Sequence, residues 1–135
     1  MKTLKLATSQ QPYSGSDRRG ALTVEFAIVA PLIFLLFLGG LELSALNFAR
    51  QTAGNASYEA ARKLIIPGGT VAQAQAEGLR QMNLVGLGTG ATVTVVNDPG
   101  FATATVAVPA SSVSWGLVRF SSGYTLRQTC TLTKE

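Results

Sequence analysis

Histidine is absent from this chain of 135 residues, and cysteine occurs only once, at Cys130. General acid–base sites and many metal sites depend on histidine. A single cysteine excludes a disulfide within the chain and any metal site built from several cysteines. In the last third of the chain only Asp98 and Glu135 supply carboxylates, so no nucleophile–base pair can be assembled there. We therefore expect no enzymatic activity, no cofactor and no metal site.

Charge is also scarce, and it is unevenly placed. Charged side chains make up 13% of the residues, and the formal net charge is +4. The first 20 residues hold four basic side chains against one acidic side chain, so they carry most of the excess. The later basic residues are scattered and follow no recognition pattern, and we expect no nucleic-acid partner. Positive charge at the front of a membrane protein favours a cytoplasmic N-terminus.

A long apolar run dominates the front of the chain. Residues 26–41 contain no charged or polar side chain, and extending the run back to Ala21 adds only Thr23 and Glu25. At 1.5 Å per residue, a helix of this length spans a hydrocarbon core of about 30 Å. Residues 21–41 are therefore predicted to cross a membrane.

The composition changes along the chain predict three parts. Residues 1–20 are polar and are predicted to form a leader peptide without fixed structure. Residues 21–64 are predicted to form one long helix, with a local kink at Pro31, which membrane helices tolerate. The sequence Pro67-Gly68-Gly69 ends this helix. Residues 65–135 are predicted to form a small α+β domain outside the cytoplasm.

Small and apolar residues recur every three or four positions in the second half of the predicted long helix. They are Leu43, Leu46, Ala49, Ala53, Ala56, Ala60 and Leu64. Such an alanine-rich stripe permits close packing against neighbouring helices or against the chain's own sheet. Outside the stripe, we expect Glu42 to be a solvated position rather than a carboxylate at the membrane boundary. Glu59 and Arg62 are expected to form a surface ion pair.

The remaining sequence predicts a short helix and three strands. Thr70, followed three residues later by Gln73, has the form of a capping box and predicts a helix over residues 70–85. The residues that this helix would present to the core are Val71, Ala74, Leu79, Met82 and Val85. Runs typical of strands follow at residues 91–96, 101–108 and 124–133, with a turn signal at residues 97–100. The expected fold class is α+β: a long N-terminal transmembrane helix, then a short helix and a three-stranded antiparallel sheet.

Cys130 alternates with threonines in the last predicted strand and shares one face with Leu126 and Leu132. A lone cysteine in this position behaves as a small apolar core residue. The alternative is a thiol that forms an intermolecular disulfide.

Glu25 is the residue in the apolar run that most needs a partner. A carboxylate inside a bilayer costs about 2–3 kcal/mol unless it is paired. If a protease cut the chain after Gly20, Ala21 would begin the mature chain with a positive α-amino group. Residues four apart on a helix are neighbours, so this amine and Glu25 could pair within one chain. They could equally pair between chains stacked with an axial shift.

Several short motifs occur together in a characteristic order. They are a basic leader ending in glycine, Val24-Glu25-Phe26-Ala27, Pro31 midway through the apolar run, Gly39-Gly40 with Glu42, and Glu59-Ala60-Ala61-Arg62. The front of the chain resembles the type IV pilins, and residues 18–63 resemble TadE/TadG-like proteins of the tight-adherence (Tad, type IVc) pilus. The resemblance implies cleavage between Gly20 and Ala21 by a prepilin peptidase, with Glu25 pairing with the new N-terminal amine during assembly.

The resemblance also implies a role and a location. Because a folded domain follows the helix, it implies a minor pilin or pseudopilin rather than the bulk fibre subunit. The partners would be the cytoplasmic membrane, the prepilin peptidase, and other pilin and Tad secretion-machinery subunits. The chain would cross the bacterial cytoplasmic membrane once, with its N-terminus in the cytoplasm, and would enter a surface pilus.

Two other interpretations of the apolar run stay open. One is an ordinary single-pass anchor that presents the α+β domain as an envelope binding module and needs no leader processing. The other is a conventional signal peptide, although such an apolar region spans only ~7–15 residues and ends in an A-x-A-like site, which this run lacks. Arg18-Arg19 hints at a twin-arginine signal, but the residues that follow fit that pattern poorly.

Overall fold

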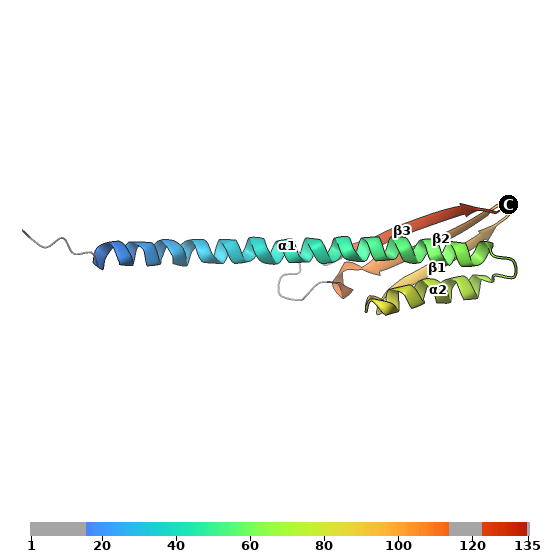
Figure 1. The fold of residues 1–135 in the computed structure, drawn as a ribbon, viewed down its shortest axis with the longest axis horizontal. Helices are drawn as coiled ribbons and strands as arrows, with labels where there is room; N and C mark the ends of the chain where they lie inside the picture. The colour runs from blue at the N-terminus through green and yellow to red at the C-terminus, as the bar shows by residue number, and fades with distance from the viewer. Residues whose placement is uncertain (1–15, 114–122, 135) are drawn as a thin grey trace, which may run out of the picture. The chain divides into compact units, whose positions relative to one another are not determined.

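The computed structural model describes residues 16–113 and 123–134, and it contains two helices, three strands and one 3-10 turn (Figure 1). The elements are α1 (Ser16–Ile65), α2 (Val71–Leu84), β1 (Thr92–Asp98), β2 (Phe101–Pro109), η1 (Ala110–Ser112) and β3 (Thr125–Thr133). The predicted α+β class, with a long apolar helix, a short helix and a three-stranded antiparallel sheet, is confirmed. The chain divides into two compact units, Met1–Leu36 and Phe37–Glu135.

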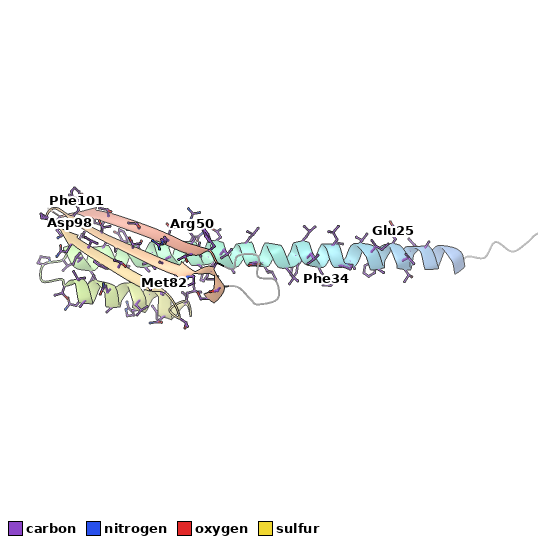
Figure 2. All side chains as sticks on the ribbon, turned by 180° about the vertical axis from the view of Figure 1, so that it is seen from behind. Glu25, Phe34, Arg50, Met82, Asp98 and Phe101 are labelled. Atoms are coloured by element: carbon purple, nitrogen blue, oxygen red, sulfur yellow. The ribbon has the colours of Figure 1, made fainter. Side chains whose placement is uncertain are left out.

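In the first unit, α1 begins at Ser16, five residues before the predicted start of the long helix. A serine followed by an aspartate is typical of a helix start, so the last part of the predicted leader is helical. From Gly20 to Leu36 every residue is exposed except the half-buried Ala30. The sticks in Figure 2 accordingly project on all sides of this part of the helix. Among the described residues, nothing covers this apolar surface of the first unit.

In the second unit, α1 buries the predicted alanine stripe. Its fully buried residues on this face include Ala49, Ala53, Ala56 and Ala60. The stripe does not extend to Leu43, which is 70% exposed, but to Glu42, which is only 9% exposed. The reason is the heptad spacing, since positions 42, 49 and 56 lie seven residues apart and share one helix face. The expectation that Glu42 is a solvated position was wrong.

Helix α2 is capped as predicted. The Thr70 side chain accepts a hydrogen bond from the Gln73 backbone amide, and the Gln73 side chain accepts one from the Thr70 amide. The buried residues of this helix are Ala74, Gly78 and Met82. Two predicted core residues were placed wrongly, because Leu79 and Val85 are 38% and 42% exposed. The buried residues of α2 are spaced four apart, so Gly78 faces the core and its bulky neighbour Leu79 does not.

Gly78 brings α2 close to both the sheet and α1. A Cβ atom added at this position would lie 3.0 Å from Cγ1 of Val93 and 3.3 Å from Cβ of Ala60. These distances are shorter than ordinary contacts between side chains. The small residue is therefore required by the packing of the three elements.

The sheet has the order β1-β2-β3, with both neighbouring pairs antiparallel. β1 and β2 form a hairpin in which Asp98 pairs with Phe101, so the first strand runs two residues beyond its predicted end. Only Pro99 and Gly100 connect the two strands, and Gly100 has a φ angle of 93°. A proline followed by a residue with positive φ is typical of a type II turn, which favours glycine at that place.

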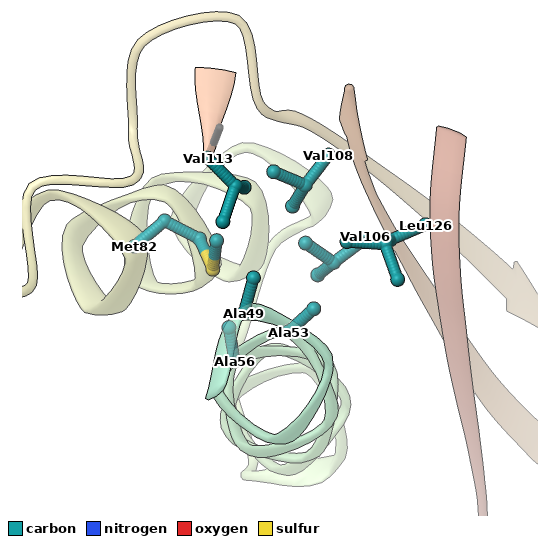
Figure 3. Close-up of a cluster of buried hydrophobic side chains, with 8 residues drawn as sticks. All are labelled: Ala49, Ala53, Ala56, Met82, Val106, Val108, Val113 and Leu126. Atoms are coloured by element: carbon teal, nitrogen blue, oxygen red, sulfur yellow. The ribbon is translucent and has the colours of Figure 1, made fainter. Parts of the chain in front are cut away.

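The core of the second unit lies between the sheet and the two helices. Figure 3 shows three alanines of α1 facing Met82 of α2 on one side and the valines of β2 on the other. The members of this cluster are Ala49, Ala53, Ala56, Met82, Val106, Val108, Val113 and Leu126. Alanine side chains keep the helix backbone close to the sheet, so the larger valines and the methionine fill the space between the layers.

The other face of the sheet is rich in threonine and is not buried. Alternate residues of each strand point to this face. The threonines of β2 pair with those of β3 through their hydroxyl groups, with an O···O distance of 3.1 Å for Thr103 and Thr131 and 2.9 Å for Thr105 and Thr129. The sheet therefore has one apolar face against the helices and one hydroxyl-bearing face.

Candidate functional site

The apolar front of α1 is the part of the chain that is best suited to a functional role. Within the described residues, one helical segment, Gly20–Ile65, is long and apolar enough to cross a membrane by its length and composition. None of its most apolar 18-residue window is buried inside the protein. An uncovered apolar helix is stable in an apolar environment, and this helix fits membrane anchoring.

The predicted cleavage position lies inside α1. Gly20 and Ala21 are both helical and exposed, and the helix starts four residues before Gly20. A Cβ atom added at Gly20 would meet nothing within 4 Å. Contacts within the described chain therefore do not require a glycine here, and any such requirement comes from a binding partner.

Glu25 follows Ala21 by four residues on the same helix and is exposed. Figure 2 shows its side chain projecting from the helix among apolar neighbours, with Phe34 projecting further along. Residues at this spacing have Cβ atoms roughly 6 Å apart, which is within reach of an ion pair. In the uncut chain, however, the backbone nitrogen of Ala21 is a neutral amide. A positive partner at this position exists only after the bond between Gly20 and Ala21 is broken.

Two further features of the predicted motif lie farther along α1. Pro31 lies inside the helix, which continues on both sides of it. Proline lacks an amide hydrogen, so one helical hydrogen bond is missing at this point. A Cβ atom added at Gly39 or at Gly40 would meet nothing within 4 Å. Neither glycine is explained by packing within the described chain, and both leave the helix surface flat.

The Glu59-Ala60-Ala61-Arg62 motif has a structural explanation in this chain. Ala60 and Ala61 are fully buried in the second cluster of core residues. Glu59 and Arg62 lie on the exposed side and form the predicted ion pair, with an N···O distance of 3.8 Å. The motif therefore serves the packing of α1.

Cys130 lies on the inner face of β3, directly opposite Ala104 of β2. It is half-buried and packs against the second core cluster. This position agrees with the interpretation of Cys130 as an apolar residue of the core. The residue is nevertheless partly exposed.

Few charged groups lie close together elsewhere in the described residues. Arg80 and Glu77 form a close pair on α2, with an N···O distance of 2.7 Å, and the hydrogen bond from Arg80 lowers the pKa of the Glu77 carboxyl. No group of three or more His, Cys, Asp or Glu side chains that could hold a metal ion occurs within residues 16–113 and 123–134.

Two structurally important residues were not identified from the sequence. Glu42 is buried although it was expected to be solvated, and Gly78 sets the distance between α2 and its neighbours. Extending the alanine stripe backward by seven residues would have identified Glu42. No local signal distinguishes Gly78 from an ordinary helix glycine, because its role depends on the contact with Val93.

A comparison with protein families agrees with the position of these features. Residues 20–62 match the family of TadE-like proteins, and this segment lies wholly within α1. No curated protein and no solved structure matches the chain. The TadE-like family is a structural component of pili and is not known as an enzyme family. The N-terminal helix of this chain is thus similar to that of TadE-like proteins, and the match supports a TadE-like protein of the Tad pilus system.

Proposed function

We propose that this chain is a minor pilin or pseudopilin-like component of a Tad-type pilus, cut after Gly20 by a prepilin peptidase. It is inserted in the cytoplasmic membrane with its N-terminus in the cytoplasm and its α+β domain outside. The observation that carries the proposal is the family match, which begins at Gly20 and includes the apolar run of residues 21–41, whose only carboxylate is Glu25.

The proposed cut changes the charge at the front of the helix. Water adds across the peptide bond between Gly20 and Ala21, which leaves a carboxylate on the leader and an amine on the mature chain. The amine takes up a proton and becomes positive near neutral pH. A helix that carried one uncompensated negative charge in its apolar part then carries one charge of each sign, four residues apart.

Pairing of these two charges supports assembly. A pair within one chain lowers the cost of holding Glu25 in the bilayer. A pair between chains requires a defined axial shift between neighbouring helices, so it favours insertion at the correct stagger. In both arrangements the uncovered apolar sides of α1 pack against the helices of other pilus subunits.

The alternative is a single-pass anchor that presents the α+β domain to an envelope partner. This arrangement needs an apolar helix but no leader processing and no positive partner at Ala21. Whether the leader is removed therefore distinguishes the minor pilin from the anchored binding module.

The test is the intact mass of the membrane-bound protein, expressed with and without a prepilin peptidase. We expect the full-length mass of 14.1 kDa without the enzyme, and the loss of residues 1–20 with it. Gly20→Ala should reduce this loss, because the added methyl group would hinder cleavage by the peptidase. It should not disturb folding, because a Cβ atom at this position meets nothing within 4 Å.

Leu22→Ala is the matched control, since it alters an exposed residue of the same helix and leaves Gly20 in place. Its leader should be removed as in the parent chain. Full-length mass in the presence of active peptidase would refute the pilin proposal and favour the anchored binding module.

A further inference from the structure

The α+β domain begins where the apolar run of α1 ends. Residues 37–41, the end of this run, belong to the second unit. The next residue, Glu42, is already buried, and Leu46 packs against the first core cluster. From Leu41 to Leu46 the helix rises only about 7.5 Å, and the headgroup layer on one side of a bilayer is about 5–7 Å thick. When residues 21–41 cross the hydrocarbon core, this end of the domain therefore lies at the headgroup layer.

Helix α2 brings its last turn to the same end of the domain, which we call the proximal end. Ala74, near the start of α2, shares a core cluster with Leu64, whereas Met82 shares the other cluster with Ala49. Helix α2 therefore runs back along α1 toward residues 37–41. Figure 1 shows its end beside the η1 turn and the start of β3. The backbone amide of Ala110 in η1 donates a hydrogen bond of 2.9 Å to the carbonyl of Tyr124, which joins these two segments.

The proximal end exposes apolar side chains from two separate segments. Leu84 and Val85 at the end of α2 are exposed, and so is Tyr124 just before β3. Tyrosine is enriched at membrane–water interfaces because its ring is apolar and its hydroxyl group is polar. Contact with a bilayer would remove the apolar surface of all three side chains from water.

Charge is distributed unevenly between the proximal end and the opposite, distal end. Among the described residues, the solvent-accessible carboxylates of the second unit are Glu59, Glu77 and Asp98, and none of them lies at the proximal end. Figure 2 shows Asp98 at the distal end and Arg50 nearer the proximal end. Arg127 follows the first residue of β3 by two positions. Neither arginine has an ion-pair partner in the part of the chain that the structure describes.

Both arginines are suited to binding lipid phosphates. The Cα atom of Arg50 lies about 14 Å beyond that of Leu41 along the helix axis. Side chains on a helix lean toward its N-terminus, so the long stem of Arg50 can bring its guanidinium group closer to the membrane surface. A guanidinium group forms two parallel hydrogen bonds with a phosphate, and it stays charged at every physiological pH.

We propose that the proximal end of the α+β domain binds the surface of an anionic bilayer. Leu84, Val85 and Tyr124 lie in the headgroup layer, and Arg50 and Arg127 pair with lipid phosphates. The occupant is the lipid surface because this end is continuous with the membrane-spanning segment and its unpaired charges are positive. The inference rests on the proposed insertion of α1 in a bilayer, and it does not depend on leader removal or on a place in a pilus.

Fluorescent labelling of the full chain in lipid nanodiscs tests the contact with the bilayer. Each variant carries Cys130→Ser and one labelled cysteine, introduced by Leu84→Cys or by Ala72→Cys. Both positions are exposed on α2, but they lie about 18 Å apart along the helix, and Ala72 is at its distal end. A quencher attached to lipid headgroups should quench the label at position 84 strongly and the label at position 72 weakly.

Two outcomes of this experiment would contradict the inference, and they differ in what else they affect. Equal quenching of the two labels in an inserted chain would overturn the lipid contact alone. A chain that does not enter the nanodiscs would overturn the lipid contact together with the proposed membrane insertion.

Charge variants test the phosphate contacts. The urea midpoint of unfolding, followed by circular dichroism, is compared between nanodiscs of phosphatidylcholine alone and of phosphatidylcholine with an equal part of phosphatidylglycerol. The parent chain should have a higher midpoint in the anionic nanodiscs. Arg50→Gln combined with Arg127→Gln should lose most of this difference. Arg62→Gln combined with Lys134→Gln removes the same charge from the distal end and should retain it. A midpoint that does not depend on lipid charge, or an equal loss in both double variants, would overturn the proposal.

Discussion

Glu25 is the only carboxylate between Ala21 and Leu41, and its surroundings on the helix are the basis of the role proposed for it. It is exposed on a helix whose neighbouring side chains are apolar and equally exposed. In water such a side chain would need no explanation. In a bilayer or a bundle of apolar helices, it needs a positive partner, and the amine that the proposed cut would release at Ala21 could supply one.

Glu25→Gln should leave leader removal unchanged and strongly reduce incorporation into the pilus. The amide keeps the size of the side chain but cannot pair with the amine as an ion. The measurement is an immunoblot of the sheared surface fraction against the membrane fraction in an assembling host. Ala27→Gln, which adds an amide to the same apolar helix but retains Glu25, should assemble better than Glu25→Gln; equal assembly of both would argue against the charge pair.

Gly78 shows how a single small residue controls the packing of the domain. Gly78→Val should lower the free energy of unfolding by about 1–3 kcal/mol, because its first side-chain atom already meets Val93 and Ala60 too closely. Urea unfolding in detergent, followed by circular dichroism, measures the change. Ala76→Val, at an exposed position of the same helix, should have a smaller effect.

Adding Val93→Ala to Gly78→Val should recover part of the lost stability, because it removes the methyl groups that approach most closely. Simple addition of the two destabilising effects would show that the clash lies elsewhere.

At the scale of elements, local signals in the sequence were sufficient for the helices and strands of the domain. The capping box at Thr70, the Pro99-Gly100 turn and the alternation of threonine with small apolar residues each depend on neighbours close in sequence. These signals predicted the short helix and three strands to within a few residues. The start of α1 was less well predicted, because residues 16–20 combine a helix-start pattern with a polar, glycine-ended leader.

Thr70→Ala should lower the free energy of unfolding by about 1 kcal/mol, because it removes the acceptor for the Gln73 amide at the start of α2. Thr70→Ser keeps the hydroxyl oxygen and should stay close to the parent chain. Urea unfolding of the three proteins provides the comparison. If the serine variant loses as much as the alanine variant, the methyl group of Thr70 and not the cap supports the helix.

At the scale of the whole molecule, the two units differ in what surrounds their apolar side chains. In the first unit they are exposed, whereas in the second they form two clusters between the helices and the sheet. All residues of both clusters come from the second unit. Folding of the α+β domain and insertion of the apolar helix are therefore separable.

A chain that lacks residues 1–36 should keep a cooperative unfolding transition without detergent, since it retains every residue of the two core clusters. The full chain should need detergent to stay dispersed, because its apolar helix is uncovered. Circular dichroism during urea unfolding measures the first outcome and sedimentation measures the second. Loss of cooperative unfolding in the shortened chain would show that the first unit supports the domain.

The sequence by itself determined the α+β class, the apolar segment, its single carboxylate and the resemblance to TadE-like proteins, because these follow from composition and short-range spacing. Only the tertiary structure decided which side chains are buried. Glu42 and Gly78 lie inside while Leu43, Leu79 and Val85 lie outside, since burial depends on which helix face meets the sheet and how closely the layers approach. The composition of the proximal end likewise depends on how α2 and the strands run along α1, which is set by contacts between residues far apart in the chain.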